Sequence, residues 1–478
     1  MRKPKSILLA FLIACGSSDG GHDTLIDAGP EGASEGGTDG GFDVIAPPGC
    51  DLTKDPKDSP ACVDTAVGIF VSPTGDDSAS GSKELPVRTI KRGLELASSK
   101  ALPRVYVCEG TYDANVEITS PVSLYGGLSC AWAHTGAKPK IAPAKGVALR
   151  VTTVGSGVLI ADIEVVGAAD GTVPGDSAIA ALISSSNSVL LRNATLRAGD
   201  AVTGEDGTTT TNYSAAAKAG VGANDGAGAV TCSCLDGTTS STGGKGGAIG
   251  AGGDPGSSMP AVGGINSGLG GATCTGGTVG SDGIARARGE AATKPGALSA
   301  SGWQSTSDAT TGANGNPGQG GGGGGGRTGF AMGGGGACGG CGGGGGKPGH
   351  SGGSSFALLS FQSTVVIDGG ELIAANAGAG GIGGAGQAGQ GGGAAGVGAC
   401  DGGPGGSGAG GSGGGGGAGG HSAPIGFVGS EPKVTSATLT PGTKGAAGGG
   451  GAAGLGPGNA GTAGASGAEG KAQNVLAL

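Results

Sequence analysis

Glycine recurs at every third position in several long runs of this chain. The runs with this spacing cover residues 244–256, 312–324, 402–420, 442–454 and 458–470. Period three is the repeat of a polyproline II helix, which rises about 3.1 Å per residue. Collagen shares this period but needs frequent proline between its glycines, and these runs contain almost none. The runs therefore predict either a bundle of such helices with their glycine faces turned inward, or a flexible linker.

The free energies of these two alternatives nearly cancel. Fixing the backbone of one residue costs about 1–2 kcal/mol, and more for glycine. One hydrogen bond between helices returns about 0.5–1.5 kcal/mol net, and weak Cα–H contacts add about 0.5–1 kcal/mol. Disulfides, at about 2–4 kcal/mol each, would favour the ordered bundle. At this level, order and disorder of the glycine-rich runs stay equally open.

Composition excludes one large globular core and argues against a nucleic-acid partner. Of the 478 residues, 120 are glycine, 23 are proline and only 3% are aromatic. Such a chain lacks the large side chains that fill an ordinary core. The net charge of −9 is spread along the chain without a basic stripe, whereas cationic side chains supply most of the affinity for nucleic acids.

The first fifteen residues have the pattern of an export signal. Three positive charges precede an apolar run over residues 7–14, which is too short to span a bilayer. The sequence Leu12-Ile13-Ala14-Cys15 looks like the bacterial lipobox, which implies removal of residues 1–14 and a lipid on Cys15. The alternative is an ordinary secretory signal with a cysteine there by chance. We expect an exported lipoprotein held on a membrane by this lipid, and, because Gly16 follows, on the outer membrane.

The cysteine count fits an oxidising compartment. Apart from Cys15, ten cysteines remain, and such sets first indicate disulfides. Cys50 with Cys62 and Cys108 with Cys130 are close enough in sequence to pair, and we expect all ten to be oxidised. Half a zinc site at the CxxC motif of residues 338–341 is the alternative, but no second motif completes it. The later cysteines form one group of Cys232, Cys234 and Cys274 and another of Cys338, Cys341 and Cys400, with their pairing left open.

Short apolar strands repeat along the chain. Residues 158–165, 189–196 and 365–372 align with one another, and each contains a strand, a polar or glycine corner and a second strand. The match extends without a gap to residues 181–184 and 357–360. Such repeats predict stacked coils of a parallel β-helix, because one coil cannot bury its apolar side alone. The alternative is a set of unrelated buried strands in a sandwich.

The gap-free match also predicts the organisation of the chain. It places Val189–Leu191 beside Val365–Ile367 in one sheet, so that the residues between them become an insertion at one corner. Long insertions cost little loop entropy, so we expect a folded core to survive removal of this one. The predicted parts are a signal peptide (1–14), a flexible acidic tether (15–62), a β-helix (63–200), a glycine-rich insertion (201–354), a returning coil (355–376) and a glycine-rich extension (377–478).

The start of the predicted β-helix also contains recognisable short motifs. They are VSPTG at residues 71–75, PxxTI at 86–90, Gly93-Leu94, and VYVxxGTY at 105–112. This stretch resembles the opening of exported right-handed parallel β-helix proteins, over about residues 67–200. It looks most like the glycine-rich surface proteins of that group in predatory and soil bacteria such as myxobacteria. The resemblance implies the fold and says little about activity.

Catalysis is the main functional alternative, since many β-helix proteins are polysaccharide lyases or hydrolases. Their sites need clustered carboxylates, often with an Arg or Lys base and Ca²⁺. Arg192 stacked above Asp368 could be such a pair, although a surface ion pair is the commoner arrangement. Histidines and aromatic platforms are scarce, and the glycine repeats lack the aspartate of calcium-binding nonapeptides.

The alignment stacks Ala161, Arg192 and Asp368 in one column, Glu164, Thr195 and Glu371 in a second, and Asp162, Asn193 and Gly369 in a third.

We therefore expect no catalytic residue, no metal site and no cofactor. The sequence favours a non-enzymatic surface protein with a structural or adhesive role toward glycans or proteins of the cell envelope or matrix. A polysaccharide lyase or hydrolase is the alternative.

The lipid anchor leads to a first test. Cys15→Ser should abolish labelling by a radioactive fatty acid and release or mislocalise the protein, because Cys15 is the residue that the lipobox assigns to the lipid. Labelling and fractionation of cells carrying either form measure this. Unchanged membrane retention without lipid in the parent protein would contradict the anchor.

Overall fold

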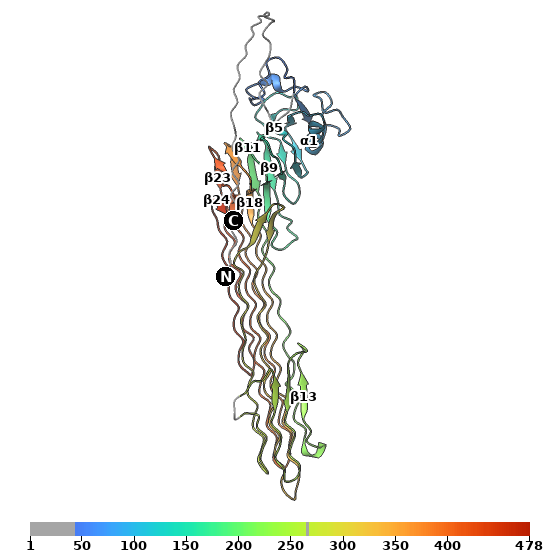
Figure 1. Cartoon of the computed structure of the whole chain (residues 1–478), viewed down its shortest axis with the longest axis vertical. Coiled ribbons are helices and arrows are strands. Elements are labelled where there is room, and N and C mark those ends of the chain that lie inside the picture. Colours follow the sequence, from blue (N-terminus) through green and yellow to red (C-terminus); the bar gives the residue numbers. More distant parts are fainter. Residues whose placement is uncertain (1–43, 264–266) are drawn as a thin grey trace, which may run out of the picture. The chain divides into compact units, whose positions relative to one another are not determined.

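The computed structural model describes residues 44–263 and 267–478, which fold as a parallel β-helix with long glycine-rich excursions (Figure 1). The predicted signal peptide and Cys15 lie outside the described residues. Three sheets, named A, B and C, each receive one parallel strand from each successive coil. The predicted all-β class is confirmed. Among the described residues, no helix is long and apolar enough to cross a bilayer.

The strands follow one another around each coil in the order A, B, C. Sheet A contains β1 (Gly68–Val71), β2 (Arg104–Cys108), β5 (Ser123–Leu128), β8 (Val158–Ala161), β11 (Val189–Arg192), β19 (Val365–Asp368) and β22 (Lys433–Val434). Sheet B contains β3 (Thr111–Tyr112), β6 (Lys140–Ile141), β9 (Glu164–Gly167), β12 (Thr195–Ala198), β20 (Glu371–Ile373) and β23 (Thr438–Thr440). Sheet C contains β4 (Val116–Ile118), β7 (Leu149–Thr152), β10 (Ala178–Ser184), β18 (Ser355–Phe361), β21 (Ser422–Val428) and β24 (Val475–Ala477).

Smaller elements accompany the three sheets. Helix α1 begins after Thr89, whose side chain accepts a hydrogen bond from the Arg92 N–H, and packs against β1 and β2. The smaller elements are η1 (Pro60–Cys62), α1 (Ile90–Ser99), η2 (Ala223–Asp225), β13 (Val230–Ser233), β14 (Ser240–Gly243), β15 (Ser257–Met259), β16 (Gly296–Ser299) and β17 (Gly302–Ser305).

The core is a set of apolar columns that run from coil to coil. Leu124, Ile160, Leu191 and Ile367 occupy successive positions of one column in sheet A, and none of them is exposed to solvent. Full burial of one such side chain contributes about 1.5–3 kcal/mol. Stacked aliphatic columns of this kind therefore hold the coils together without large aromatic residues.

The predicted pairing of distant strands is confirmed in sheets A and B. Val189 pairs with Val365 in sheet A, and Thr195 pairs with Glu371 in sheet B. The alignment was wrong by one residue in sheet C, where Ala181 pairs with Leu358 instead of Ala357. The reason is that four residues join β10 to β11, whereas three residues join β18 to β19.

Residues 44–62, which the sequence assigned to the flexible tether, belong to the folded unit. The Cys50–Cys62 disulfide closes this segment. Its carbonyl groups at Leu52 and Lys54 accept hydrogen bonds from Arg104, a fully buried residue of β2. Residues 44–62 therefore pack against sheet A and satisfy a charge that would otherwise be costly to bury.

All three glycine-rich segments leave the β-helix at the same corner, between sheet B and sheet C. The first lies between β12 and β18, the second between β20 and β21, and the third between β23 and β24. Residues 377–478 are thus not a single extension, because they also contain the strands of another coil. Three successive coils each send out one excursion.

The excursions pack together as one bundle of extended chains (Figure 1). Residues 402–420 form its central chain. From every third residue along one side, N–H groups donate to the segment before it, as in Gly411 to Gln387, Gly414 to Gly384 and Gly417 to Gly381, at 2.9 Å each. Backbone hydrogen bonds join the central chain to six segments of the described residues, at 277–292, 310–322, 335–353, 378–396, 445–454 and 459–468.

Glycine is required in this bundle because the chains approach one another too closely for a side chain. A Cβ atom on Gly417 would lie 2.0 Å from the His350 carbonyl oxygen, and one on Gly414 would lie 2.1 Å from that of Lys347. The bundle core therefore consists of backbone, as in the ordered alternative left open by the sequence. Because the insertion supplies chains that contact 402–420, its removal would open the bundle core, while survival of the β-helix core without the insertion stays a prediction.

Adjacent glycines in one chain provide a matched test. A Cβ on Gly448 would lie 2.0 Å from the Gly381 carbonyl oxygen, whereas one on Gly449 meets only Ile382 Cγ2 at 4.0 Å. We expect Gly448→Ala to lower the free energy of unfolding by about 3 kcal/mol, and Gly449→Ala to leave it unchanged or raise it by about 0.5 kcal/mol. Urea titrations of both variants measure the difference, and equal effects would contradict a close-packed bundle.

Candidate functional site

The first column predicted from the sequence is an ion-paired cluster on sheet A. Arg192 donates a hydrogen bond to Asp55 at 2.7 Å and lies 3.9 Å from Asp368. The Asp55 side chain is only 3% exposed, whereas that of Asp368 is 45% exposed. Burial by itself would lower the pKa of Arg192, but the hydrogen bond and charge of Asp55 raise it above its ordinary value. The stronger partner of Arg192 is thus an aspartate that the sequence assigned to the tether.

The second column carries a cluster of charges on sheet B. Arg197 bridges two coils, since it lies 3.6 Å from Glu164 and 3.0 Å from Glu371. Lys138 donates to the Thr195 hydroxyl at 2.9 Å. Burial lowers the pKa of Lys138, while the neighbouring carboxylates act in the opposite direction. Arg197 follows Thr195 by two residues, so the alignment could have identified it, whereas nothing in the pattern points to Lys138.

The third column forms a tight corner between sheets A and B. Asp162, Asn193 and Gly369 have positive φ angles of 55°, 48° and 71°. Asp, Asn and Gly are the residues that adopt this left-handed conformation most readily. The Asn193 side-chain amide donates to the Asp162 carboxylate, and the Lys138 ammonium lies 3.4 Å from the Asn193 carbonyl oxygen. The side chains of Asp162 and Asn193 therefore link two successive corners, whereas Gly369 supplies only its backbone conformation to the third.

Chemically, these columns form a ladder of paired charges. Arg192 and Arg197 each lie between two carboxylates. Within residues 44–263 and 267–478, no three His, Cys, Asp or Glu side chains gather as a metal ion would require. The ladder can stabilise the stacking of coils, and Lys138 is the group in it whose pKa is shifted toward that of a general base.

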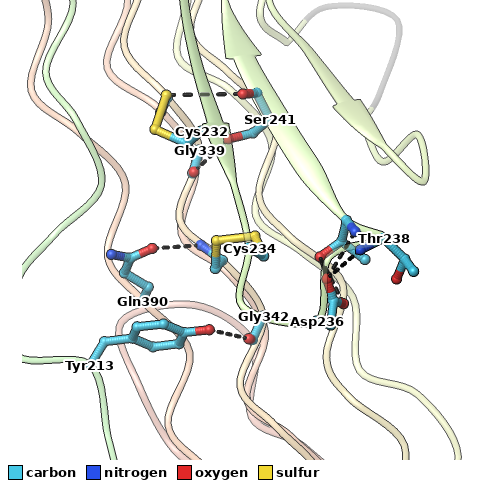
Figure 2. Close-up of a disulfide and its surroundings, with 12 residues drawn as sticks. Tyr213, Cys232, Cys234, Asp236, Thr238, Ser241, Gly339, Gly342 and Gln390 are labelled. Carbon is cyan, nitrogen blue, oxygen red and sulfur yellow. Dashed lines mark hydrogen bonds between the residues drawn. A yellow bond between two sulfur atoms is a disulfide. The ribbon is translucent and has the colours of Figure 1, made fainter.

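A second candidate region lies in the bundle, where two disulfides fix a hairpin to a glycine-rich chain (Figure 2). Cys232 in β13 pairs with Cys338, and Cys234, which directly follows β13, pairs with Cys341, so both bonds join this hairpin to residues 335–353. Beside them, Ser241 donates to the Gly339 carbonyl oxygen at 2.7 Å, Tyr213 donates to that of Gly342 at 3.1 Å, and Gln390 accepts from the Cys341 N–H at 3.0 Å. The pairing crosses between the two cysteine groups of the sequence.

The remaining cysteines divide into bonded and free. Cys50–Cys62 and Cys108–Cys130 are present as disulfides. Cys274 and Cys400 are free thiols with their sulfur atoms 3.5 Å apart, so the expectation of ten oxidised cysteines does not hold for these two. They lie in adjacent turns of the bundle.

The bundle chains reverse direction in a set of turns at the end of the bundle away from the β-helix strands. We call this set of turns the distal cap; it consists of residues 248–251, 273–276, 327–332 and 397–401. Backbone N–H groups of one turn or its flanking residue donate to carbonyls of the next, as from Gly326 to Ala251 at 2.8 Å and from Ala399 to Met332 at 2.9 Å. Sequence reasoning missed this cap, although the interruption of a glycine run at residues 327–332 was a usable signal.

Large apolar side chains stand out from the distal cap. Ile249 is 58% exposed, and Phe330 and Val397 are each 73% exposed. The Arg327 guanidinium lies over the Phe330 ring, 4.4 Å from its centroid. An exposed cation–π pair of this kind contributes about 0.5–1 kcal/mol and leaves both groups accessible.

Polar side chains of the bundle serve mostly to bond neighbouring chains. Gln387 and Gln390 accept hydrogen bonds from backbone N–H groups of Gly344 and Cys341. Side chains spaced six residues apart on a neighbouring chain also accept hydrogen bonds from backbone N–H groups. The pairs are Asp200 with Asn376 N–H, Asp206 with Ile382 N–H and Asn212 with Ala388 N–H. These groups are thereby engaged within the protein.

Comparison with known proteins reaches only part of the chain. Residues 73–143 match a family described as "Protein of unknown function (DUF1565)". Among solved structures, a rhamnogalacturonan lyase is similar, at 14% identity and a TM-score of 0.21, over 30% of this chain and 40% of the lyase. No curated protein matches.

Asp55 is buried and Asp368 is exposed, so substitutions at Arg192 and Asp368 can test whether the ion pair of Arg192 is structural. Arg192→Ala leaves the Asp55 carboxylate buried without its cation, so we expect the free energy of unfolding to fall by about 3–5 kcal/mol. Asp368→Ala removes a solvated partner and should cost less than about 1 kcal/mol. Denaturant titrations measure both. Equal losses would show that Asp55 is not the partner that matters.

Proposed function

We propose that this protein is an exported, lipid-anchored surface protein that acts without catalysis, in a structural or adhesive role. In this proposal the β-helix is the base of a glycine-rich bundle, and the bundle is the working part. The observation that carries it is the common origin of three excursions at one corner of three successive coils. A large share of the chain forms one bundle with a core of backbone. A spacer between two parts of the protein would not need such an ordered bundle.

Rigidity of the bundle supports this role. Its central chain is bonded on all sides, and the two disulfides span sequence separations of 106 and 107 residues. A disulfide that closes a loop of about 100 residues stabilises by up to about 4.7 kcal/mol in the chain-entropy model. A protein that must hold a contact surface in a defined position outside the cell benefits from such cross-links.

Polar side chains that already bond to backbone within the bundle limit the surfaces on which a partner would bind. Asn, Gln and Asp groups in the bundle interact with neighbouring backbone, so they are not free to form broad contacts with a partner. The distal cap and the exposed flanks remain available. Many weak contacts from copies anchored side by side would add up to firm adhesion.

A polysaccharide-active enzyme is the second candidate, and the sheet B cluster is the observation in its favour. Lys138 has a lowered pKa and lies in the field of Glu164 and Glu371. A basic residue beside carboxylates is the combination that lyases use. Reducing-end and unsaturated-product assays on acidic and neutral polysaccharides test it. Activity that disappears in Lys138→Ala or Arg192→Ala would establish the enzyme in place of our proposal.

The matched glycine pair tests the role of the bundle. Cells that display Gly448→Ala should lose adhesion to envelope and matrix fragments, because the substitution forces two chains apart, whereas Gly449→Ala should adhere like the parent. Surface amounts are equalised by antibody labelling. Equal adhesion by both variants would assign the activity to the β-helix, and absence of adhesion in the parent would remove the adhesive role.

A further inference from the structure

The distal cap brings three large exposed apolar side chains and a cation onto neighbouring turns, whereas exposed apolar residues such as Ile382 and Leu455 also occur elsewhere on the bundle. Bundle chains carry mostly Gly, Ala, Ser and Thr, while aromatic residues make up only 3% of the protein. Yet Phe330 is placed at the tip of a turn with most of its surface in solvent, and Ile249 and Val397 project from two neighbouring turns. Exposed apolar side chains gathered at one place commonly mark a binding surface.

The cap is also held in place before any partner arrives. Thr273 donates through its hydroxyl to the Gly250 carbonyl oxygen at 3.4 Å, and Cys274 N–H donates to that of Gly326 at 3.2 Å. Ala223, at the start of η2, donates to the Val397 carbonyl oxygen at 2.8 Å. These bonds connect the turns that carry the apolar side chains, so little conformational entropy remains to be lost on binding.

The arrangement of these side chains indicates the kind of partner. They come from three separate turns, and each protrudes on its own. A folded protein partner would need a matching pocket for each side chain, whereas the fluid interior of a bilayer accepts separate protrusions without matching. Arg327 stands beside the Phe330 ring, so an inserted phenylalanine would bring a guanidinium to the level of the lipid phosphates.

We propose that the distal cap inserts Phe330, Val397 and Ile249 into the outer surface of a lipid bilayer, with Arg327 bound to a phosphate group. This rests on the proposed adhesive function and names its partner as the lipid of a facing membrane. Asp401 and Asp225 lie in or beside the cap, so its charge does not favour anionic lipid. Zwitterionic phosphatidylcholine is therefore a sufficient ligand.

Vesicle flotation tests the proposal with residues 15–478 carrying Cys15→Ser, which have neither the apolar signal segment nor a lipid of their own. The parent should float with phosphatidylcholine vesicles, Phe330→Ser should lower the partition coefficient about tenfold, and Phe330→Ser with Val397→Ser should abolish binding. Leu455→Ser is the matched control, since Leu455 is 68% exposed on the bundle but outside the cap. It should bind like the parent.

A site-specific readout separates insertion from a change in folding. Phe330→Trp should shift its fluorescence to the blue when vesicles are added, and quenchers attached to the lipid chains should reach it. Absence of vesicle binding, equal binding by the serine variants, or an unshifted tryptophan would overturn the proposal. Adhesion that depends on Gly448 but not on vesicle lipids would overturn it too, in favour of a protein or glycan partner, while leaving the adhesive function intact.

Discussion

Hydrogen bonding between backbones at every third residue is the constraint on which the glycine-rich half of this structure depends. Such bonds need neighbouring chains so close that a carbonyl oxygen occupies the place of a Cβ atom, as the 2.0 Å distance at Gly417 shows. Glycine is therefore used here for close approach and not for flexibility. Its larger loss of conformational entropy is offset because the central chain makes backbone bonds in all directions.

The β-helix makes this packing possible by determining where the chains start. Coils of a parallel sheet stack about 4.8 Å apart. Because every excursion leaves at the corner between sheets B and C, chains from neighbouring coils enter the bundle already side by side. Gly353 N–H bonds to Val202 and Ser355 N–H bonds to His421 at this entrance. Stacking of aliphatic columns thus reduces the entropy that each long excursion would otherwise lose when its chains pair.

The parts of the fold that could be predicted are those in which side chains carry the information. The column of Val189 and Val365 could be aligned because its β-branched residues repeat with the period of the coil. The neighbours of each glycine chain could not be predicted, since glycine has no side chain that distinguishes one partner from another. The pairing of Cys232 with Cys338 stayed open for the same reason, because it depends on which chains are neighbours. The contact between Asp55 and Arg192 could not be predicted either, since 137 residues separate the two in sequence.

A bundle of this kind has an edge problem like that of a β-sheet, because its outer chains present unpaired N–H groups to other chains. Asp200, Asp206 and Asn212 bond to such groups along one outer chain at every sixth residue. A side chain that covers backbone protects the bundle from further growth, but it is no longer available to a partner. At the turns, where the hydrogen-bonded rows end, Ile249, Phe330 and Val397 are exposed to solvent. In the proposed adhesive function, the same backbone regularity that stabilises the bundle would leave the distal cap and the exposed flanks as the surfaces for recognition.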